Sequence, residues 1–265
     1  MSQINHFKLA VYGLLASGLA LGASPAAGQG AECGGLPSHA DLKSQLEAVV
    51  GGDNAGLGNE MWASTVNRDG IVCAVAFSGG DRDDQWPGSR VISAQKANTA
   101  NAFSLEAGNG AGIALSSGNL YGVVLEQGSL YGLQFSNPVD TGIAYGGPNH
   151  AGGNANNYGQ PNDPMVGAFI GGVNVFGGGL ALYDSTGLLL GGLGVSGDTS
   201  CTDHIVAWRV REFLGLDNVP GGVGGNNTDN LNIADPVTPN TFEHPNCGNQ
   251  GEVEIIDALD GDPAP

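Results

Sequence analysis

The chain has 265 residues, with 26 acidic and only 8 basic side chains, which gives a formal net charge of -18 at pH 7. The negative electrostatic potential of so acidic a protein argues against nucleic acid and anionic membrane surfaces as partners. The chain has 47 glycines in 265 residues, a far larger share than the roughly 7% of ordinary chains. They follow no collagen-like period and therefore predict long loops.

Residues 1–30 have the pattern of a secretory signal. Lys8 precedes the apolar run Leu9–Leu21, which is too short and too rich in glycine and alanine for a membrane anchor. The small residues of Ala23–Ala27 suit a signal peptidase. We predict a periplasmic or secreted protein without stable membrane insertion, and a retained N-terminal anchor is the alternative.

The four cysteines form no C-x-x-C pair, and a zinc site would need closer ligands. An oxidising compartment favours disulfides instead. Three connectivities are possible. Position favours Cys33–Cys247, which would join the two chain ends, and Cys73–Cys201, which would join an early strand to the turn before the last helix.

The first elements after the signal are a helix and a hairpin. Pro37-Ser38 begins a helix with Leu42, Leu46 and Val49-Val50 on one face. Two strands follow, and the Asp-Gly turn between them is a strong hairpin signal. The second strand is apolar almost throughout, which predicts a central position covered on both faces. The strands are Met61–Val66 and Ile71–Phe77, and the turn is Asn67–Gly70.

The middle of the chain predicts a close-packing helix, Ser89–Leu105, and a weaker one, Ser117–Glu126. Residues 146–163 form a low-complexity insertion in which only Tyr158 can pack. Beyond residue 216 the composition predicts a Gly/Asn/Pro-rich acidic tail, 217–265, ordered only near Cys247.

Between the insertion and the tail, three short apolar runs predict a β-meander that leads into a last helix. Asp184–Gly187 has the composition of a hairpin turn. Ser200–Asp203 resembles a capping box with Asp in place of Glu, and an apolar helix face follows. The runs are Val173–Phe176, Leu180–Tyr183 and Leu188–Leu190, and the helix face is Val206, Val210 and Phe213.

The order of elements predicts an α+β domain over residues 31–216, with one antiparallel sheet and helices packed on it. Gly192–Gly197 matches G-x-G-x-x-G, but no later strand completes a βαβ unit, so close packing of a helix on the sheet explains these glycines better than a dinucleotide. Nucleophile-elbow and H-E-x-x-H motifs are absent.

The helix from Ser89 carries the strongest functional signal. Ile92, Lys96, Thr99 and Phe103 share one face, and a lysine on an apolar stripe either extends to water or meets an anion. Near its N-terminus, Arg90, Arg82 and Trp86 add positive charge and an aromatic ring. In so acidic a chain, this clustering predicts a pocket for a carboxylate or propionate. His204, in the last helix, is interpreted as solvent-facing, with a metal-ligand role as the weaker alternative.

These segments resemble the GlcG/HbpS-like haem-binding family, and also the C-terminal domain of PduO-type corrinoid adenosyltransferases. The resemblance covers about residues 36–216 and is carried by four segments in the same order. These are Asn67–Gly70, Gln95–Ala100 (Q-K-A-N-T-A), Gly171–Val173 and Gly191–Gly197.

The resemblance implies an α-β-α layered, profilin-like domain that is often a homo-oligomer and that in some members binds haem. It places a haem-iron contact on Thr99, with Lys96 one turn earlier. The Gly/Asn-rich insertion, the four cysteines and the long tail depart from the family pattern. A hydroxyl is a weak iron ligand compared with His, Cys or Met, so haem held this way would exchange readily.

The leading hypothesis is therefore an exported, non-enzymatic protein that binds haem or another tetrapyrrole for scavenging, storage or sensing. An alternative is an enzyme acting on a small carboxylate, in which Arg68, Arg82 or Lys96 holds the acid and Asp81 or Asp84 moves protons. A third hypothesis is a structural module whose glycine-rich faces pack between subunits.

Overall fold

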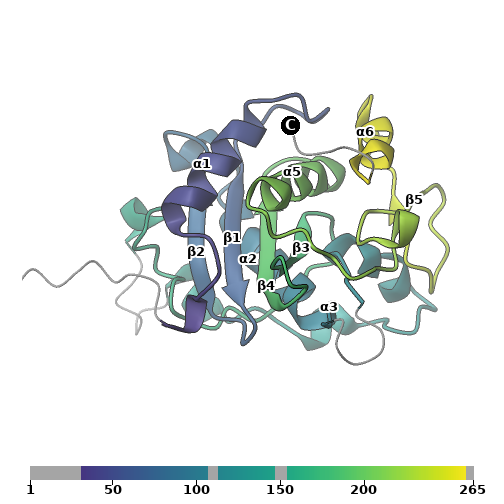
Figure 1. The fold of residues 1–265 in the computed structure, drawn as a ribbon, viewed down its shortest axis with the longest axis horizontal. Helices are drawn as coiled ribbons and strands as arrows, with labels where there is room; N and C mark the ends of the chain where they lie inside the picture. The colour runs from purple at the N-terminus through teal and green to yellow at the C-terminus, as the bar shows by residue number, and fades with distance from the viewer. Residues whose placement is uncertain (1–30, 107–112, 147–153, 261–265) are drawn as a thin grey trace, which may run out of the picture.

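The protein is built around a four-stranded antiparallel sheet in the order β2-β1-β4-β3 (Figure 1). The structure, a computed structural model, describes residues 31–106, 113–146 and 154–260, so the predicted signal lies outside it. Helices α1 and α5 cover one face of the sheet and α2 covers the other. The predicted α-β-α layering is confirmed. The strands are β1 Trp62–Asn67, β2 Val72–Phe77, β3 Gly179–Tyr183 and β4 Leu189–Ser196, and the helices are α1 His39–Val50, α2 Ser89–Phe103 and α5 Ser200–Phe213.

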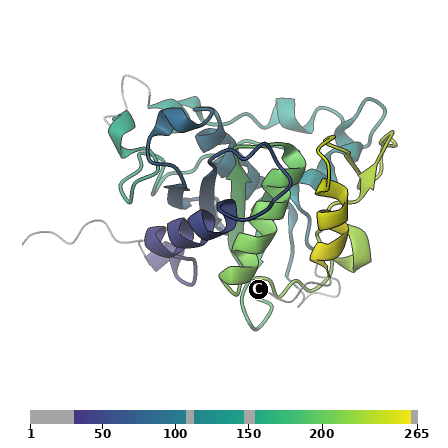
Figure 2. The same ribbon diagram turned by 90° about the horizontal axis from the view of Figure 1, so that it is seen from above.

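The remaining elements are short and lie around this sandwich. Helix α6 packs beside α5, so that α1, α5 and α6 form a row in the view from above (Figure 2). The short elements are η1 Ala31–Cys33, η2 Arg82–Asp84, η4 Ser117–Leu120, η5 Gly122–Val124, α3 Leu133–Ser136, α4 Thr141–Tyr145, η6 Ala155–Asn157, η7 Gly225–Asn227, β5 Ile233–Ala234, β6 His244–Pro245 and α6 Glu252–Leu259.

Local sequence explains both hairpins. Gly70 N donates to Asn67 O at 2.9 Å with a φ of +86°, a conformation that glycine adopts without steric cost. Gly187 N donates to Asp184 O at 2.9 Å in the β3–β4 turn. Helix α1 begins as predicted, because Ser38 and Asp41 form a capping box. The N-cap of α5 is Thr199, one residue before the predicted Ser200. The Thr199 side chain accepts from Thr202 N, whereas Ser200 Oγ accepts from Gly177 N and lies 2.7 Å from His244 Nε2.

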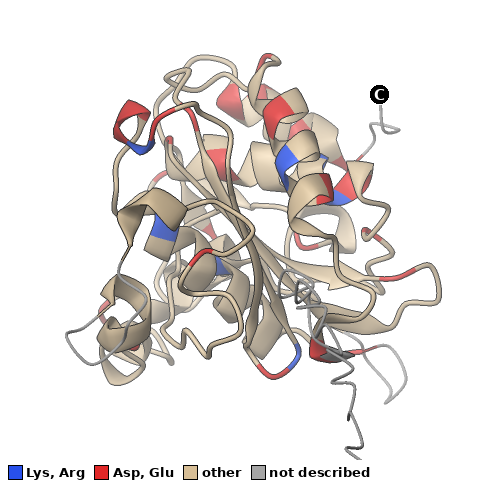
Figure 3. Ribbon diagram, turned by 90° about the vertical axis from the view of Figure 1, so that its left-hand side faces the viewer, with Lys and Arg blue, Asp and Glu red and all other residues tan. Residues whose placement is uncertain are grey.

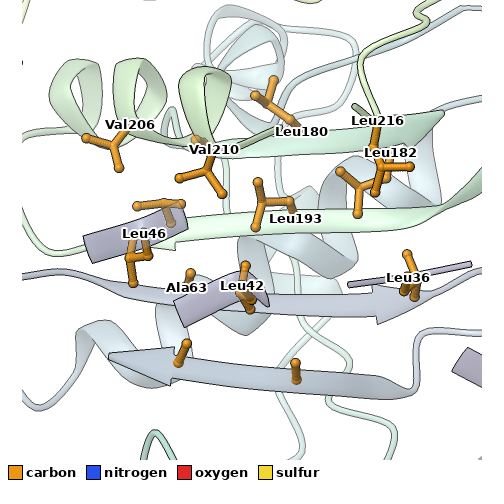
Figure 4. Packing of buried hydrophobic residues seen from close by; sticks show 14 of the residues in the cluster. Leu36, Leu42, Leu46, Ala63, Leu180, Leu182, Leu193, Val206, Val210 and Leu216 are labelled. Carbon is orange, nitrogen blue, oxygen red and sulfur yellow. The ribbon is translucent and has the colours of Figure 1, made fainter. Parts of the chain in front are cut away.

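Strand β4 shows how the sheet separates its two faces. Because successive side chains of a strand point to opposite faces, Leu193 and Val195 lie in the core under α1 and α5, whereas Gly192 and Gly194 face α2. The core on the α1 and α5 side combines Leu42 with residues of the strands and of α5 (Figure 4).

On the other face, helix α2 lies directly against the sheet backbone. A Cβ atom added at Gly194 would meet Ser93 O and lie 2.5 Å from Ala97 N, and one at Gly192 would meet Ala97 O. The glycine motif is therefore a seat for a helix, as the sequence indicated. The helix seated there is α2.

The predicted central position of β2 is wrong, although its burial on both faces is confirmed. β2 is an edge strand whose outer side is covered by residues 167–169. Val72 N donates to Ala168 O and Gly167 N donates to Val72 O, each at 2.9 Å. At Val72, a loop thus satisfies edge hydrogen bonds that a fifth strand would otherwise take.

Two predicted elements are absent. Val173–Phe176 is not a strand, because its backbone bonds to other segments: Asn174 N donates to Thr99 Oγ1. Ser117–Glu126 forms two 3₁₀ turns instead of a helix. Gly122 N donates to Glu243 O, so a tertiary contact replaces the helical hydrogen bond.

The C-terminal segment packs more extensively than the predicted tail. Leu231, Ile256 and Leu259 form a buried cluster with Cys201 and Ile205 of α5. This cluster explains why α6 lies against α5.

Candidate functional site

Lys96 meets an anion, but the anion belongs to the protein itself. Its Nζ pairs with Asp203 Oδ2 at 2.6 Å and donates to Val195 O at 3.1 Å. Both side chains are almost fully buried. Burial lowers the pKa of Lys96 and raises the pKa of Asp203 to about 6, with the opposite charge of each partner working against burial. Lys96 therefore joins α2 to β4 and α5, and it is not available to an external ligand.

Thr99 is likewise engaged inside the protein. Its Oγ1 donates to Gln95 O at 2.8 Å and accepts from Asn174 N at 2.9 Å, and the residue is fully buried. The hydroxyl thus uses both its donor and its acceptor capacity within the chain. In this structure Thr99 has no exposed surface through which it could make the predicted contact with a haem iron.

Arg90 is buried beneath the insertion. Its guanidinium forms a bidentate pair with Asp163, donates to Ala144 O at 3.0 Å, and stacks on Tyr158 with 3.8 Å from Cζ to the ring centroid. The described part of the Gly/Asn-rich insertion, residues 154–163, thus covers the N-terminal end of α2. Tyr158 packs as the sequence indicated.

The solvent-facing interpretation of His204 is wrong. The residue is fully buried, and its Nε2 lies 3.2 Å from Asn230 Oδ1. Burial, helped by the positive charge of Arg211, lowers its pKa to about 3, so the ring is neutral at physiological pH. It faces no carboxylate or thiolate that would complete a metal site among the described residues.

Arg82 is the one predicted cation that is exposed and uncommitted. Of the seven Lys and Arg residues in the described ranges, it alone has no hydrogen bond or ion pair. Along the ribbon, positions of Asp and Glu are more frequent than those of Lys and Arg (Figure 3). An unpaired guanidinium in such a protein is a natural partner for an external anion.

Arg82 lines a polar cavity of about 190 Å³ together with Lys43, a residue that the sequence did not single out as a site. Lys43 Nζ donates to Phe77 O at 2.6 Å and pairs with Glu47 Oε1 at 2.7 Å. Asn156 and Gln160 of the insertion also line the cavity. We call these four side chains and the space between them the Arg82–Lys43 cavity.

The cavity is built from three segments that are distant in the chain. Lys43 comes from α1, Arg82 from the turn after β2, and the amides from the insertion. The lining also contains Asp81, whose Oδ1 accepts a hydrogen bond from Asp83 N. The two cations and the amide groups can donate to the oxygens of a bound carboxylate. The one hint of Lys43 in the sequence was that, with Lys96, it is one of two lysines after the predicted signal.

Trp86 does not share this cavity. It is 54% exposed and lines a separate hollow with Asp83 and Asp84, where negative charge disfavours a carboxylate. Asp81 and Asp84 cap the η2 turn: Asp81 Oδ1 accepts from Asp83 N, and Asp84 Oδ2 accepts from Asp81 N. Arg68 donates to the Asn101 side chain at 2.6 Å. The five predicted ligand-binding residues are thus not brought together.

All four cysteines form disulfides, but the predicted pairing is wrong. The bridges are Cys33–Cys73 and Cys201–Cys247, with Cα atoms 5.8 Å and 6.0 Å apart. Cys33 lies beside the edge of the sheet, where Asn67 Nδ2 donates to Glu32 O, whereas Cys247 packs against the first turn of α5. Cys33 and Cys247 therefore lie against different elements.

Within the described ranges, none of the helices combines the length and apolar character needed to cross a membrane.

Comparisons with known proteins give structural similarity only. No family model and no curated protein match the chain. The Klebsiella pneumoniae protein ORFY, a DUF336 protein, aligns with a TM-score of 0.42 and 20% identity over 67% of this chain and 90% of its own. A PduOC:heme complex aligns with a TM-score of 0.39 and 23% identity over 67% and 94%. At this level neither structure identifies a ligand for this chain, and the heme belongs to that protein.

Proposed function

We propose that the protein is an exported, non-enzymatic binding protein for a small carboxylate-bearing molecule, which it holds in the Arg82–Lys43 cavity. The observation that carries the proposal is that Arg82, the uncommitted cation of the described ranges, lines the same polar cavity as Lys43. A charge-assisted hydrogen bond from a guanidinium to a carboxylate supplies both affinity and orientation.

A tetrapyrrole, which the sequence resemblance implies, belongs to the same ligand class through its propionates. A cavity of about 190 Å³ is smaller than the sites that enclose drug-sized ligands, so it would hold a propionate and leave the macrocycle outside. The buried Lys96 and Thr99 would take no part, unlike in the sequence-based hypothesis.

The enzymatic alternative has less support. Asp81 is the acidic group nearest to Arg82 in the cavity lining, and its Oδ1 caps the η2 turn. A general base must reach the proton that it moves, whereas the Asp81 carboxylate is already engaged as the cap of the η2 turn.

Substituting Arg82 tests the proposal. In calorimetric titration with acetate, succinate or citrate, R82Q is expected to bind at least about 10-fold more weakly than wild type, because it loses a charge-assisted bond worth about 1.5–3 kcal/mol. R82K should keep part of the affinity, since lysine retains the charge without the planar fork. Q250E, a substitution near α6, makes the same change in net charge as R82Q and should bind like wild type.

A parallel titration with hemin, followed at the Soret band, identifies the ligand. A saturable shift that R82Q weakens indicates a tetrapyrrole, whereas carboxylate binding without such a shift indicates a smaller acid. Equal affinity of wild type and R82Q for every ligand, or no saturable binding at all, would contradict the proposed site.

A further inference from the structure

A third group that can bind metal lies beside the Cys201–Cys247 disulfide. His244, in the short strand β6, is almost fully buried there. One donor atom from each of Cys201, His244 and Cys247 lies within 4.8 Å of the other two. Within the part of the chain that the structure describes, this is the one set of three such residues with this spacing. None of the three lines the Arg82–Lys43 cavity.

We propose that reduction of this disulfide converts Cys201, Cys247 and His244 into a three-ligand site for Zn²⁺. A dithiol reductant supplies two electrons: the S–S bond breaks, two thiols form, and the reductant closes its own disulfide. Zn²⁺ then replaces the two thiol protons, which are released to solvent. Two thiolates and an imidazole are a donor set that zinc prefers, with a fourth position left open.

The distances allow this change without rebuilding the fold. Zinc binds sulfur at about 2.3 Å and nitrogen at about 2.0–2.1 Å, so donors of a tetrahedral site lie about 3.3–3.8 Å apart. The three donors already lie within 4.8 Å of one another. After reduction the sulfurs need to separate, and the histidine needs to approach them by about an ångström.

The surrounding contacts orient the donors. The carbonyl oxygen of Pro245 lies 2.8 Å from His244 Nδ1, 3.8 Å from Cys201 Sγ and 3.9 Å from Cys247 Sγ. Because a carbonyl oxygen can only accept, Nδ1 carries the ring proton in the oxidised protein. We infer that Nδ1 is the ligand: it gives up its hydrogen bond to Pro245 O as the ring proton moves to Nε2. His244 Nε2, 2.7 Å from Ser200 Oγ, then has the second partner that fixes a ligating imidazole.

The protein also stabilises the thiolates. Cys201 N donates to Cys247 Sγ at 3.1 Å, and Cys201 lies in the first turn of the 14-residue helix α5. Backbone donors and the positive end of a helix favour negative sulfur. Ile205, Leu231 and Ile256 belong to the same buried hydrophobic cluster as Cys201, and Cys247 packs against it.

Cobalt titration tests the site, because thiolate-bound Co²⁺ has a charge-transfer band in the near ultraviolet. The full chain is reduced with a phosphine, which becomes the phosphine oxide, and Co²⁺ and then Zn²⁺ are added. Reduced wild type should bind one equivalent of Co²⁺, which Zn²⁺ displaces. Oxidised wild type should bind none.

Matched variants assign the ligands. C33A/C73A removes the other disulfide and should bind Co²⁺ like reduced wild type, whereas C201A/C247A should lose the band. H244N should bind at least about 10-fold more weakly. H39N, which changes a histidine bonded to Gly159 O, should bind normally.

Several outcomes would overturn the site. These are a folded, reduced wild type without the band, an undiminished band in C201A/C247A, and equal affinity of H244N and wild type. Should reduction loosen the C-terminal segment, Zn²⁺ must restore the near-ultraviolet circular dichroism of reduced wild type. Failure to restore it would equally refute the site. Carboxylate binding is a separate measurement, so either proposal can fail alone.

Discussion

Gly194→Ala is expected to lower the free energy of unfolding by about 3 kcal/mol, a large fraction of the roughly 5–15 kcal/mol that is typical of a folded domain. The added methyl group would meet Ser93 O and lie 2.5 Å from Ala97 N, both in the backbone of α2. Backbone atoms cannot rotate away as a side chain can, so the whole helix must lift from the sheet. Urea denaturation followed by circular dichroism measures the loss.

Gly88→Ala is the matched control for this substitution. Gly88 is the N-cap of the same helix, with an ordinary φ of -64°, and a Cβ atom there meets no atom within 4 Å. The free energy of unfolding of Gly88→Ala should stay within about 1 kcal/mol of the wild-type value. If Gly194→Ala were as stable as Gly88→Ala, the close seating of α2 on β4 would be wrong.

Lys96→Met is expected to cost about 3–5 kcal/mol, because it leaves the buried carboxylate of Asp203 without its partner. The double variant K96M/D203N removes both charges and should be more stable than K96M alone. An asparagine at 203 can still accept the hydrogen bond from Asp198 N. Chemical denaturation of both variants gives the comparison.

Lys43→Met controls for the loss of a lysine as such. The Lys43–Glu47 pair is 34% and 47% exposed, and pairs of this kind contribute about 0–1 kcal/mol. If K96M lost no more stability than K43M, Lys96 would not stabilise the buried charge of Asp203.

The K96M variant should regain stability in acid. Burial raises the pKa of Asp203 to about 6 from its ordinary 3.8, and the charge of Lys96 limits this rise. Without Lys96 the folded-state pKa rises further, so the folded state binds a proton that the unfolded state releases. Stability then increases as pH falls through the folded pKa toward 3.8. The deficit relative to wild type should therefore be smaller at about pH 5 than at about pH 7.5, and an unchanged deficit would exclude this linkage.

Residue patterns predicted only part of the candidate site. The sequence identified Arg82 as a cation near a possible anion pocket, and the structure places it at a polar cavity. The patterns could not identify Lys43, Asn156 and Gln160 as its companions, because loops and an insertion bring them together. They also could not show that Lys96 and Arg90 are neutralised by Asp203 and Asp163, which lie 107 and 73 residues away.

By itself the sequence determined the elements whose causes are local. The Asp-Gly turn after Asn67, the Ser38 cap and the Asp184–Gly187 turn each depend on neighbouring residues, so the hairpins, helices and layered α+β class could be predicted. Only the tertiary structure decided what depends on distant partners. It made β2 an edge strand, paired Cys33 with Cys73, and joined Lys96 to Asp203. The reason is physical: a buried charge, thiol or strand edge must find a partner, and the partner is chosen by the packing of the whole chain.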